Sequence, residues 1–270
     1  MNESGVNDSL HNSIAHTTRG IYTIVYSMNL LLGLPTNSYI LYQIVIKTGV
    51  PSEFFTFNLT LCEIIFCFKT PLVLLSYYTI PHTLDNVKHF FEGFIGMGRP
   101  LFQTCICVER YLAVIHPVLF LKYKPLRYRL ACSAVAWLIV FGCCVMTMLI
   151  RYAAFYVYLP LYVILFSGKL FSCLVILRAL RNPGPGEGKM DREGANLAKI
   201  RAFKIITVIM LSTVVNYVSL LLLLPLQSIA SHSHFVLAIA ICISISILSG
   251  LTQPFIYLHR AGKLSCIKGP

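Results

Sequence analysis

Seven long stretches of apolar residues run along the chain, and short polar segments separate them. Each stretch has the roughly 20 residues that an α-helix needs to cross the hydrocarbon core of a bilayer. They cover residues 21–46, 54–79, 91–115, 130–150, 155–180, 203–226 and 234–258. The pattern predicts an all-α membrane protein, a seven-transmembrane helix bundle over residues 21–258. Residues 1–20 and 259–270 are then its two tails.

The composition agrees with this pattern. The chain is 57% hydrophobic and only 12% charged, whereas a soluble domain is about 25% charged. Seven spans and two tails use all 270 residues, so we expect no separate soluble domain. The short turn RYAAF (151–155) is all that divides the fourth span from the fifth.

The distribution of basic residues predicts the orientation of the bundle. If the N-terminus lies outside, three basic residues fall in outer segments: Arg19, Lys88 and Arg151. Fifteen fall in inner segments: Lys47, Lys122, Lys124, Arg127, Arg129, Arg178, Arg181, Lys189, Arg192, Lys199, Arg201, Lys204, Arg260, Lys263 and Lys268. This is the positive-inside bias of membrane proteins. The net charge of +12 therefore requires no nucleic-acid partner, because the lipid bilayer and its anionic inner leaflet explain it.

The termini and cysteines add candidate modification sites. The polar start MNESGVNDSLHNSIAHTTRG predicts no cleavable signal peptide. Asn2 and Asn7 begin glycosylation acceptor triplets there, whereas the similar triplet at Asn58 lies within a span and is discounted. Nine of the ten cysteines lie in spans, so no outer-loop disulfide is available. Cys266 follows the last span and is either a palmitoylation site or a free thiol.

Charged residues also mark the predicted inner end of the third span, in CVERYLAVIHP (107–117). Taken alone, Glu109 and Arg110 are equally well explained as a helix-end pair that reaches to the membrane interface. The motifs elsewhere in the chain change that interpretation. In chain order they are GLPTNSYIL (33–41), NLTLCE (58–63), ERYLAVIHP (109–117), Trp137, RAFK (201–204) and QPFIY (253–257).

This ordered set resembles the rhodopsin-like (class A) G-protein-coupled receptors across all seven spans. The stretch LAVIHPVLFLKYKP (112–125) resembles the branch with nucleotide, lipid and protease-activated receptors. The resemblance implies a multi-pass plasma-membrane receptor whose partners are a heterotrimeric G-protein and an extracellular ligand. It implies no enzyme activity, cofactor or metal. No nucleophile motif, phosphate-binding glycine loop or zinc spacing suggests otherwise.

The resemblance also assigns roles at the inner end of the bundle. Arg110 is expected to couple to the G-protein, with Glu109 as its restraint in the inactive state and Tyr111 completing the motif. Pro254 and Tyr257 belong to the seventh-span motif, and Tyr257 is expected to move toward Arg110 on activation. An ion pair near water costs little to break, so ligand binding can shift such a two-state element.

Ionisable residues at membrane depth are costly, which makes them functional candidates. Glu63 stands where the family has an aspartate that helps to bind sodium. Arg99 lies eleven residues before Arg110, about three helical turns toward the outside. We expect Glu63 and Arg99 to form a buried ion pair, near the first-span Asn37, that replaces the sodium ion. The alternative is that each charge finds water or a backbone carbonyl separately.

A second group of polar residues suggests an outer ligand site. Lys69, Arg151, His232 and His234, with Tyr217 of the sixth span, are candidates for a cavity mouth that takes a small anionic ligand. The alternative is that Lys69 pairs locally and the histidines are plain loop residues. We expect the KTP sequence (69–71) to bend its helix at Pro71.

Several family features are missing, which keeps other functions open. Asp85 stands where the outer end of the third span carries a cysteine, and Tyr217 and Ser219 replace a sixth-span tryptophan and proline. Gln253 and Gly168 replace an asparagine and a tyrosine of the usual switch. A non-signalling receptor partner, a chemosensory receptor and a small transporter therefore remain alternatives, although no inverted repeat supports the last.

Overall fold

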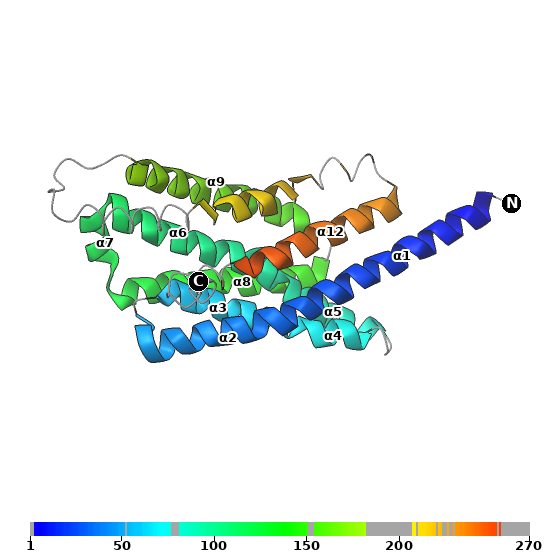
Figure 1. Cartoon of the computed structure of the whole chain (residues 1–270), viewed down its shortest axis with the longest axis horizontal. Coiled ribbons are helices and arrows are strands. Elements are labelled where there is room, and N and C mark those ends of the chain that lie inside the picture. The colour runs from blue at the N-terminus through cyan, green and yellow to red at the C-terminus, as the bar shows by residue number, and fades with distance from the viewer. Residues whose placement is uncertain are drawn as a thin grey trace, which may run out of the picture.

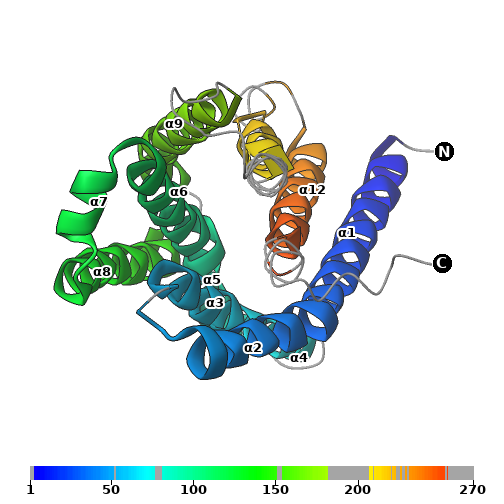
Figure 2. The same ribbon diagram turned by 60° about the vertical axis from the view of Figure 1, so that its left-hand side comes forward.

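The structure is a computed structural model. It describes residues 3–51, 53–76, 81–150, 154–181, 207–208, 210–219, 221–222, 226, 229, 231–252 and 254. Within these ranges the regular elements are all helices. The long helices lie side by side along one axis (Figure 1). Turned by 60°, they form a bundle in which α12 (His232–Gly250) lies beside α1 (Glu3–Met28) (Figure 2).

The first span is one continuous helix made of four pieces. α1 passes into the π-helical turn η1 (Asn29–Gly33), then α2 (Leu34–Gln43) and a second π-helical turn η2 (Ile44–Thr48). The helix ends at Gly49, whose φ of 83° favours glycine. The polar N-terminal segment is helical from Glu3 onward and extends beyond the bundle (Figure 1).

The second and third spans are also interrupted helices. α3 (Phe54–Cys67) and α4 (Lys69–Ser76) meet at Phe68, three residues before Pro71. The break is therefore N-terminal to the proline, as expected when a missing N–H and a ring clash disturb the preceding turn. The third span consists of α5 (Pro81–Gly93), the π-helical turn η3 (Phe94–Gly98) and α6 (Arg99–Ile115).

The remaining described helices complete the bundle. A short helix α7 (Pro117–Tyr123) joins α6 to α8 (Leu126–Ile150), and α9 (Ala154–Arg181) follows. Helical residues 210–219 lie between α9 and α12 in the chain. The main contacts along the bundle pair α6 with α9, α5 with α8, α1 with α12, and α3 with both α2 and α6.

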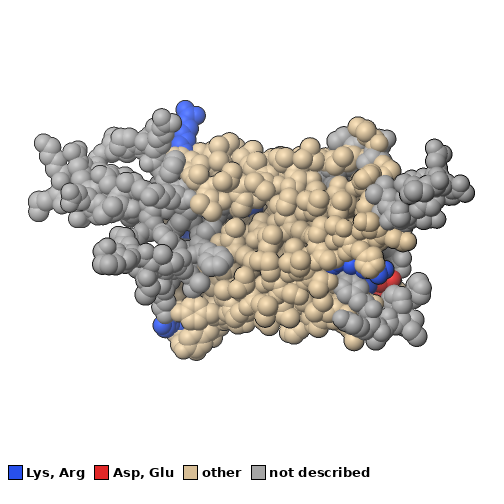
Figure 3. Space-filling model, turned by 45° about the vertical axis from the view of Figure 1, so that its right-hand side comes forward, with Lys and Arg blue, Asp and Glu red and all other residues tan. Residues whose placement is uncertain are grey.

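Four described helices are long and apolar enough to cross a membrane: Phe54–Ser76, Leu126–Ile150, Val157–Ala179 and Ser233–Gly250. They overlap the second, fourth, fifth and seventh predicted spans. Large apolar side chains face outward, such as Leu138 at 73% exposed and Ile164 at 66%. On the face drawn in Figure 3, charged residues gather toward the two ends of the molecule. The predicted fold class, an all-α seven-helix membrane protein, is confirmed, and the exact division into spans and tails stays a prediction.

The core lies between α3, η3, α6 and α8. Phe66, Phe94, Phe102 and Val140 are almost completely buried there. α5 and α8 are closely packed at Gly93, where an added Cβ would lie 2.6 Å from both Cα and Sγ of Cys144. Glycine is required here because any side chain would overlap the neighbouring backbone.

Candidate functional site

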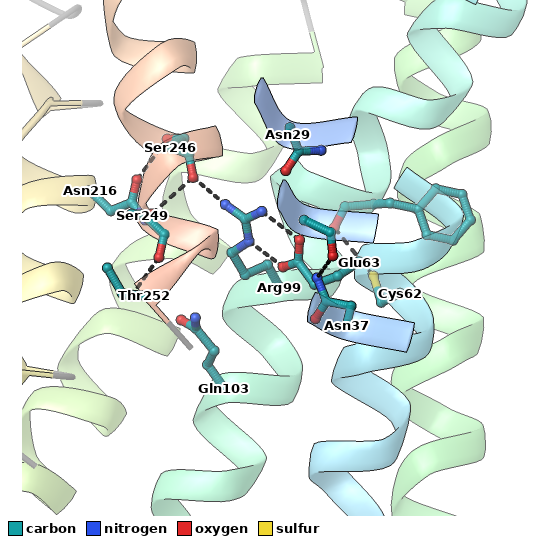
Figure 4. Close-up of polar contacts among 12 residues, drawn as sticks. Asn29, Asn37, Cys62, Glu63, Arg99, Gln103, Asn216, Ser246, Ser249 and Thr252 are labelled. Atoms are coloured by element: carbon teal, nitrogen blue, oxygen red, sulfur yellow. Dashed lines mark hydrogen bonds and ion pairs between the residues drawn. The ribbon is translucent and has the colours of Figure 1, made fainter. Parts of the chain in front are cut away.

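A buried ion pair between Glu63 and Arg99 lies in the middle of the bundle (Figure 4). Nη2 of Arg99 donates to Oε2 of Glu63 at 2.7 Å, and Nε donates to Oε1. The side chain of Glu63 is 8% exposed, and that of Arg99 is 3% exposed. The third guanidinium nitrogen donates to the backbone carbonyl of Ser246 on α12. The structure therefore brings together the two charges that the sequence suggested, and Arg99 joins the second, third and seventh spans.

One glycine makes room for this pair, and another allows close packing beside it. An added Cβ at Gly250 would overlap the Arg99 guanidinium, and one at Gly98 would lie 2.5 Å from Sγ of Cys62. Paired arginine and carboxylate groups are stable in low dielectric only when their geometry is good and their remaining N–H groups are satisfied. The small residue at position 250 allows that geometry.

The helix around Arg99 is widened by the next residue, Pro100. Pro100 has no N–H group, so the carbonyl of Gly96 has no donor four residues later. The hydroxyl of Tyr162 from α9 donates to that carbonyl instead. π-helical turns of this kind are frequent at functional sites, and η3 ends one residue before Arg99.

Polar side chains extend the site toward the sixth and seventh spans. Nδ2 of Asn216 donates to Oγ of Ser249 at 2.5 Å, and Oγ of Ser246 donates to Oδ1 of Asn216 at 2.7 Å. Asn37 is buried, but its amide donates to the carbonyl of Gly33 in its own helix at 2.8 Å. Asn37 thus lies near the pair (Figure 4) and is bonded within the first span.

At the predicted inner end, the arginine motif has different partners from those expected. Nη2 of Arg110 lies 3.4 Å from Oε1 of Glu53, the residue that precedes α3. Glu109 forms its ion pair with Arg129 of α8, and Arg129 also donates to the carbonyl of Pro51. The two side chains thus contact different elements in this structure, and the expected restraint of Arg110 by Glu109 stays a prediction.

Other members of the predicted inner switch are partly described. The hydroxyl of Tyr111 lies 3.3 Å from Nε2 of His116, and its ring packs against Phe171 of α9. Pro254 is buried. Tyr257 lies outside the described residues, so its movement toward Arg110 stays a prediction.

Lys69 is part of the scaffold. Its side chain is 3% exposed, and Nζ contacts Glu92 of α5 at 2.8 Å and the hydroxyl of Tyr26 at 2.7 Å. These contacts agree with the alternative stated above, in which Lys69 pairs locally and does not face a ligand site. His234 is exposed in the first turn of α12.

Some predicted site residues have no described side chain. The backbones of Asn7 and His232 are helical, in α1 and at the start of α12, without described side chains. Asn2, Arg151 and Cys266 lie outside the described residues. Asn58 is 6% exposed, and its Oδ1 accepts from Nε1 of Trp137 at 2.8 Å, in keeping with its exclusion as a glycosylation site.

Sequence reasoning missed one buried charge, Lys169 of α9. Its Nζ donates to Oε1 of Gln103 at 2.5 Å, and the residue is 1% exposed. Tyr217 lies close to the same region, with its ring 4.6 Å from that of Phe166 and 5.5 Å from that of Tyr162. A lysine within an apolar span was itself a signal of a buried site.

Comparison of the sequence with known protein families gives a match. The pattern of the 7 transmembrane receptor (rhodopsin family) matches residues 36–155, which contain Asn37, Glu63, Arg99 and the Glu109–Arg110–Tyr111 motif. The chain is rhodopsin-like over these residues. The predicted resemblance is confirmed over this region.

Individual relatives agree with this assignment. A purinoceptor of Rattus norvegicus, subtype 6, is 31% identical over 132 residues, which are 46% of this chain and 40% of the relative. A purinoceptor of Gallus gallus, subtype 3, is 32% identical over 136 residues, again 46% and 40%. G-protein coupled receptor 68 of Bos taurus is 29% identical over 146 residues, 48% and 38%. The matched region thus spans about two fifths of the length of these relatives, two of which are named purinoceptors.

Proposed function

We propose that this chain is a G-protein-coupled receptor of the plasma membrane, and not an enzyme, that passes an extracellular signal to a heterotrimeric G-protein. The main support is the arginine motif in a rhodopsin-like region. Arg110 is 40% exposed and held by a long contact to Glu53. A partly exposed pair of this kind contributes only about 0–1 kcal/mol, so Arg110 is available for a new partner at little cost.

The Glu63–Arg99 pair serves, in this proposal, as a built-in replacement for a bound cation. Its guanidinium already occupies both carboxylate oxygens of Glu63. A sodium ion would have to displace a charged group that is 3% exposed. We therefore expect the receptor to function without sodium regulation.

The extracellular ligand is proposed to be a small anion. Two of the relatives are named purinoceptors, which makes nucleotides the first class to try. Lys69 already has a carboxylate partner in Glu92, so the ligand-binding positive charge is expected to come from other outer residues, with Arg151, His232 and His234 as the candidates from the sequence.

The test is nucleotide exchange on a panel of purified heterotrimeric G-proteins, with the chain in lipid nanodiscs, first without ligand and then with nucleotides. Arg110→Ala should abolish exchange. Arg127→Ala is the matched control, because Arg127 is exposed at the same end and its recorded contacts are with the neighbouring Tyr128. Equal exchange from the native chain and the Arg110→Ala variant would contradict the proposal.

A second function, a non-signalling partner of another receptor, is favoured by one observation. Arg99 fixes the second, third and seventh spans through Glu63 and the Ser246 carbonyl, which opposes movement of the seventh span. A folded protein that promotes no exchange with any G-protein or nucleotide would favour this function.

A further inference from the structure

A small cavity lies within the bundle, between α6, α9, residues 210–219 and α12. Its polar lining consists largely of Arg99, Gln103, Lys169, Asn216, Tyr217 and Ser246. The cavity has a volume of about 30 Å³. A space of this size holds one or two water molecules or a single monatomic ion of similar radius.

Lys169 places an uncompensated positive charge on this cavity. In the described part of the chain, no carboxylate lies within ion-pair distance of its Nζ, whereas Arg99 on the same cavity is matched by Glu63. The recorded polar contact of Lys169 is the uncharged amide oxygen of Gln103. An ammonium group carries three donors, and isolated charge at membrane depth is costly.

Tyr217 supplies an independent second observation. The residue is 6% exposed, and its hydroxyl is buried without a hydrogen-bond partner among the described residues. Buried polar groups are nearly always paired, and each exception requires an explanation. Tyr217 lines the same cavity as Lys169, so a residue with an unsatisfied hydroxyl and a residue with an unmatched ammonium group border one space.

We propose that this cavity binds one monatomic anion of the halide class, such as chloride, between Lys169 and the Tyr217 hydroxyl. A halide accepts hydrogen bonds from both groups and neutralises the lysine. A cation is disfavoured by Lys169 and Arg99, and water alone leaves the lysine charge unmatched. The site differs from the Glu63–Arg99 pair, and it requires no coupling to a G-protein.

The anion would also contribute to stability, because a ligand that binds only the folded state raises the free energy of unfolding. It would join α6, α9 and the helical residues 210–219, whose side chains surround the cavity. The full chain in nanodiscs should therefore melt at a higher temperature in chloride or bromide than in gluconate, with sodium and ionic strength held constant. We expect a saturable increase of a few degrees.

Lys169→Gln should remove this halide dependence, because it keeps N–H donors but loses the charge. Lys88→Gln is the matched control: Lys88 pairs with Asp85 at 2.6 Å and is 20% exposed, and its variant should retain the dependence. Tyr217→Phe should weaken the apparent halide affinity several-fold. Equal melting temperatures of the native chain in halide and gluconate, or a halide effect that survives Lys169→Gln, would overturn the proposal.

A direct measurement covers the case in which Lys169→Gln fails to fold. Crystals of the native protein soaked in bromide should show an anomalous scattering peak within contact distance of Lys169 Nζ and the Tyr217 hydroxyl. A water-sized peak without anomalous signal at that position would show that the cavity holds water, and would also overturn the proposal.

Discussion

The guanidinium of Arg99 from α6 occupies the space that a side chain at Gly250 of α12 would need. The same guanidinium donates to Glu63 and to the Ser246 carbonyl. A large cation on one helix is thus accommodated by the smallest residue on another, and the seventh span helps to hold the pair in place.

Gly250→Ala should therefore destabilise the protein by about 1–3 kcal/mol, the usual cost of overpacking a core. The measurement is the free energy of unfolding in mixed detergent micelles. Gly168→Ala is the matched control, because an added Cβ at Gly168 would meet nothing within 4 Å. It should leave stability unchanged or slightly raise it. A Gly250→Ala protein as stable as this control would contradict the close fit.

The buried pair itself can be measured with a double-mutant cycle. Glu63→Gln and Arg99→Leu should each cost about 3–5 kcal/mol, because each leaves one buried charge without its partner. The double variant should recover part of that loss. Simple addition of the two single effects in the same unfolding assay would show that the residues are not coupled.

Sodium should have no specific effect on the native protein. Melting temperatures in sodium chloride and in potassium chloride are expected to agree, since the cation site is filled by Arg99. Arg99→Ser removes the guanidinium and leaves Glu63 open, so this variant should gain a sodium-dependent rise in melting temperature. Chloride stays constant throughout, which separates this experiment from the halide test. A sodium effect on the native protein would argue against the replacement.

Release of Arg110 should raise basal signalling. Glu53→Gln removes the carboxylate charge that Arg110 contacts at 3.4 Å. Because a partly exposed pair contributes at most about 1 kcal/mol, basal nucleotide exchange should rise by no more than about fivefold. The Arg127→Ala variant should show no rise. Reduced exchange in Glu53→Gln would mean that Glu53 supports the active state.

Lys69 is expected to stabilise the outer half of the bundle. Lys69→Met should lower the free energy of unfolding by about 1–3 kcal/mol, since it removes the contacts of the buried ammonium with Glu92 and with the Tyr26 hydroxyl. Glu92 is 33% exposed and keeps His89 at 3.0 Å. Lys88→Met, at the more exposed pair with Asp85, should cost about 1 kcal/mol or less. If both variants lose the same small amount, Lys69 contributes no more than a surface pair.

The sequence predicts the bundle well because apolar runs of membrane length have few possible structures. Glu63 and Arg99 could also be predicted to meet, since the family motifs place both at the same depth on adjacent spans. Lys169 could have been found by the same rule, because it interrupts the apolar run LYVILFSGKLFSCLVIL (161–177).

Partners at the inner end were harder to predict. Glu109 and Arg110 are adjacent in sequence, yet successive residues on a helix point about 100° apart. Their contacts therefore go to Arg129 of α8 and to Glu53 near the start of α3. Such pairings depend on the rotation of each helix about its axis and on loop conformation, which a single sequence does not specify.

The close approach of Gly93 to Cys144 affects how α5 and α8 come apart. All nine cysteines among the described residues are free. At Gly93, α5 is therefore held against α8 by close packing and not by a disulfide bond. A cross-link would persist in the unfolded chain, whereas this contact disappears when the helices separate. The contact is then as reversible as the fold itself, and the protein should tolerate reducing agents without loss of stability.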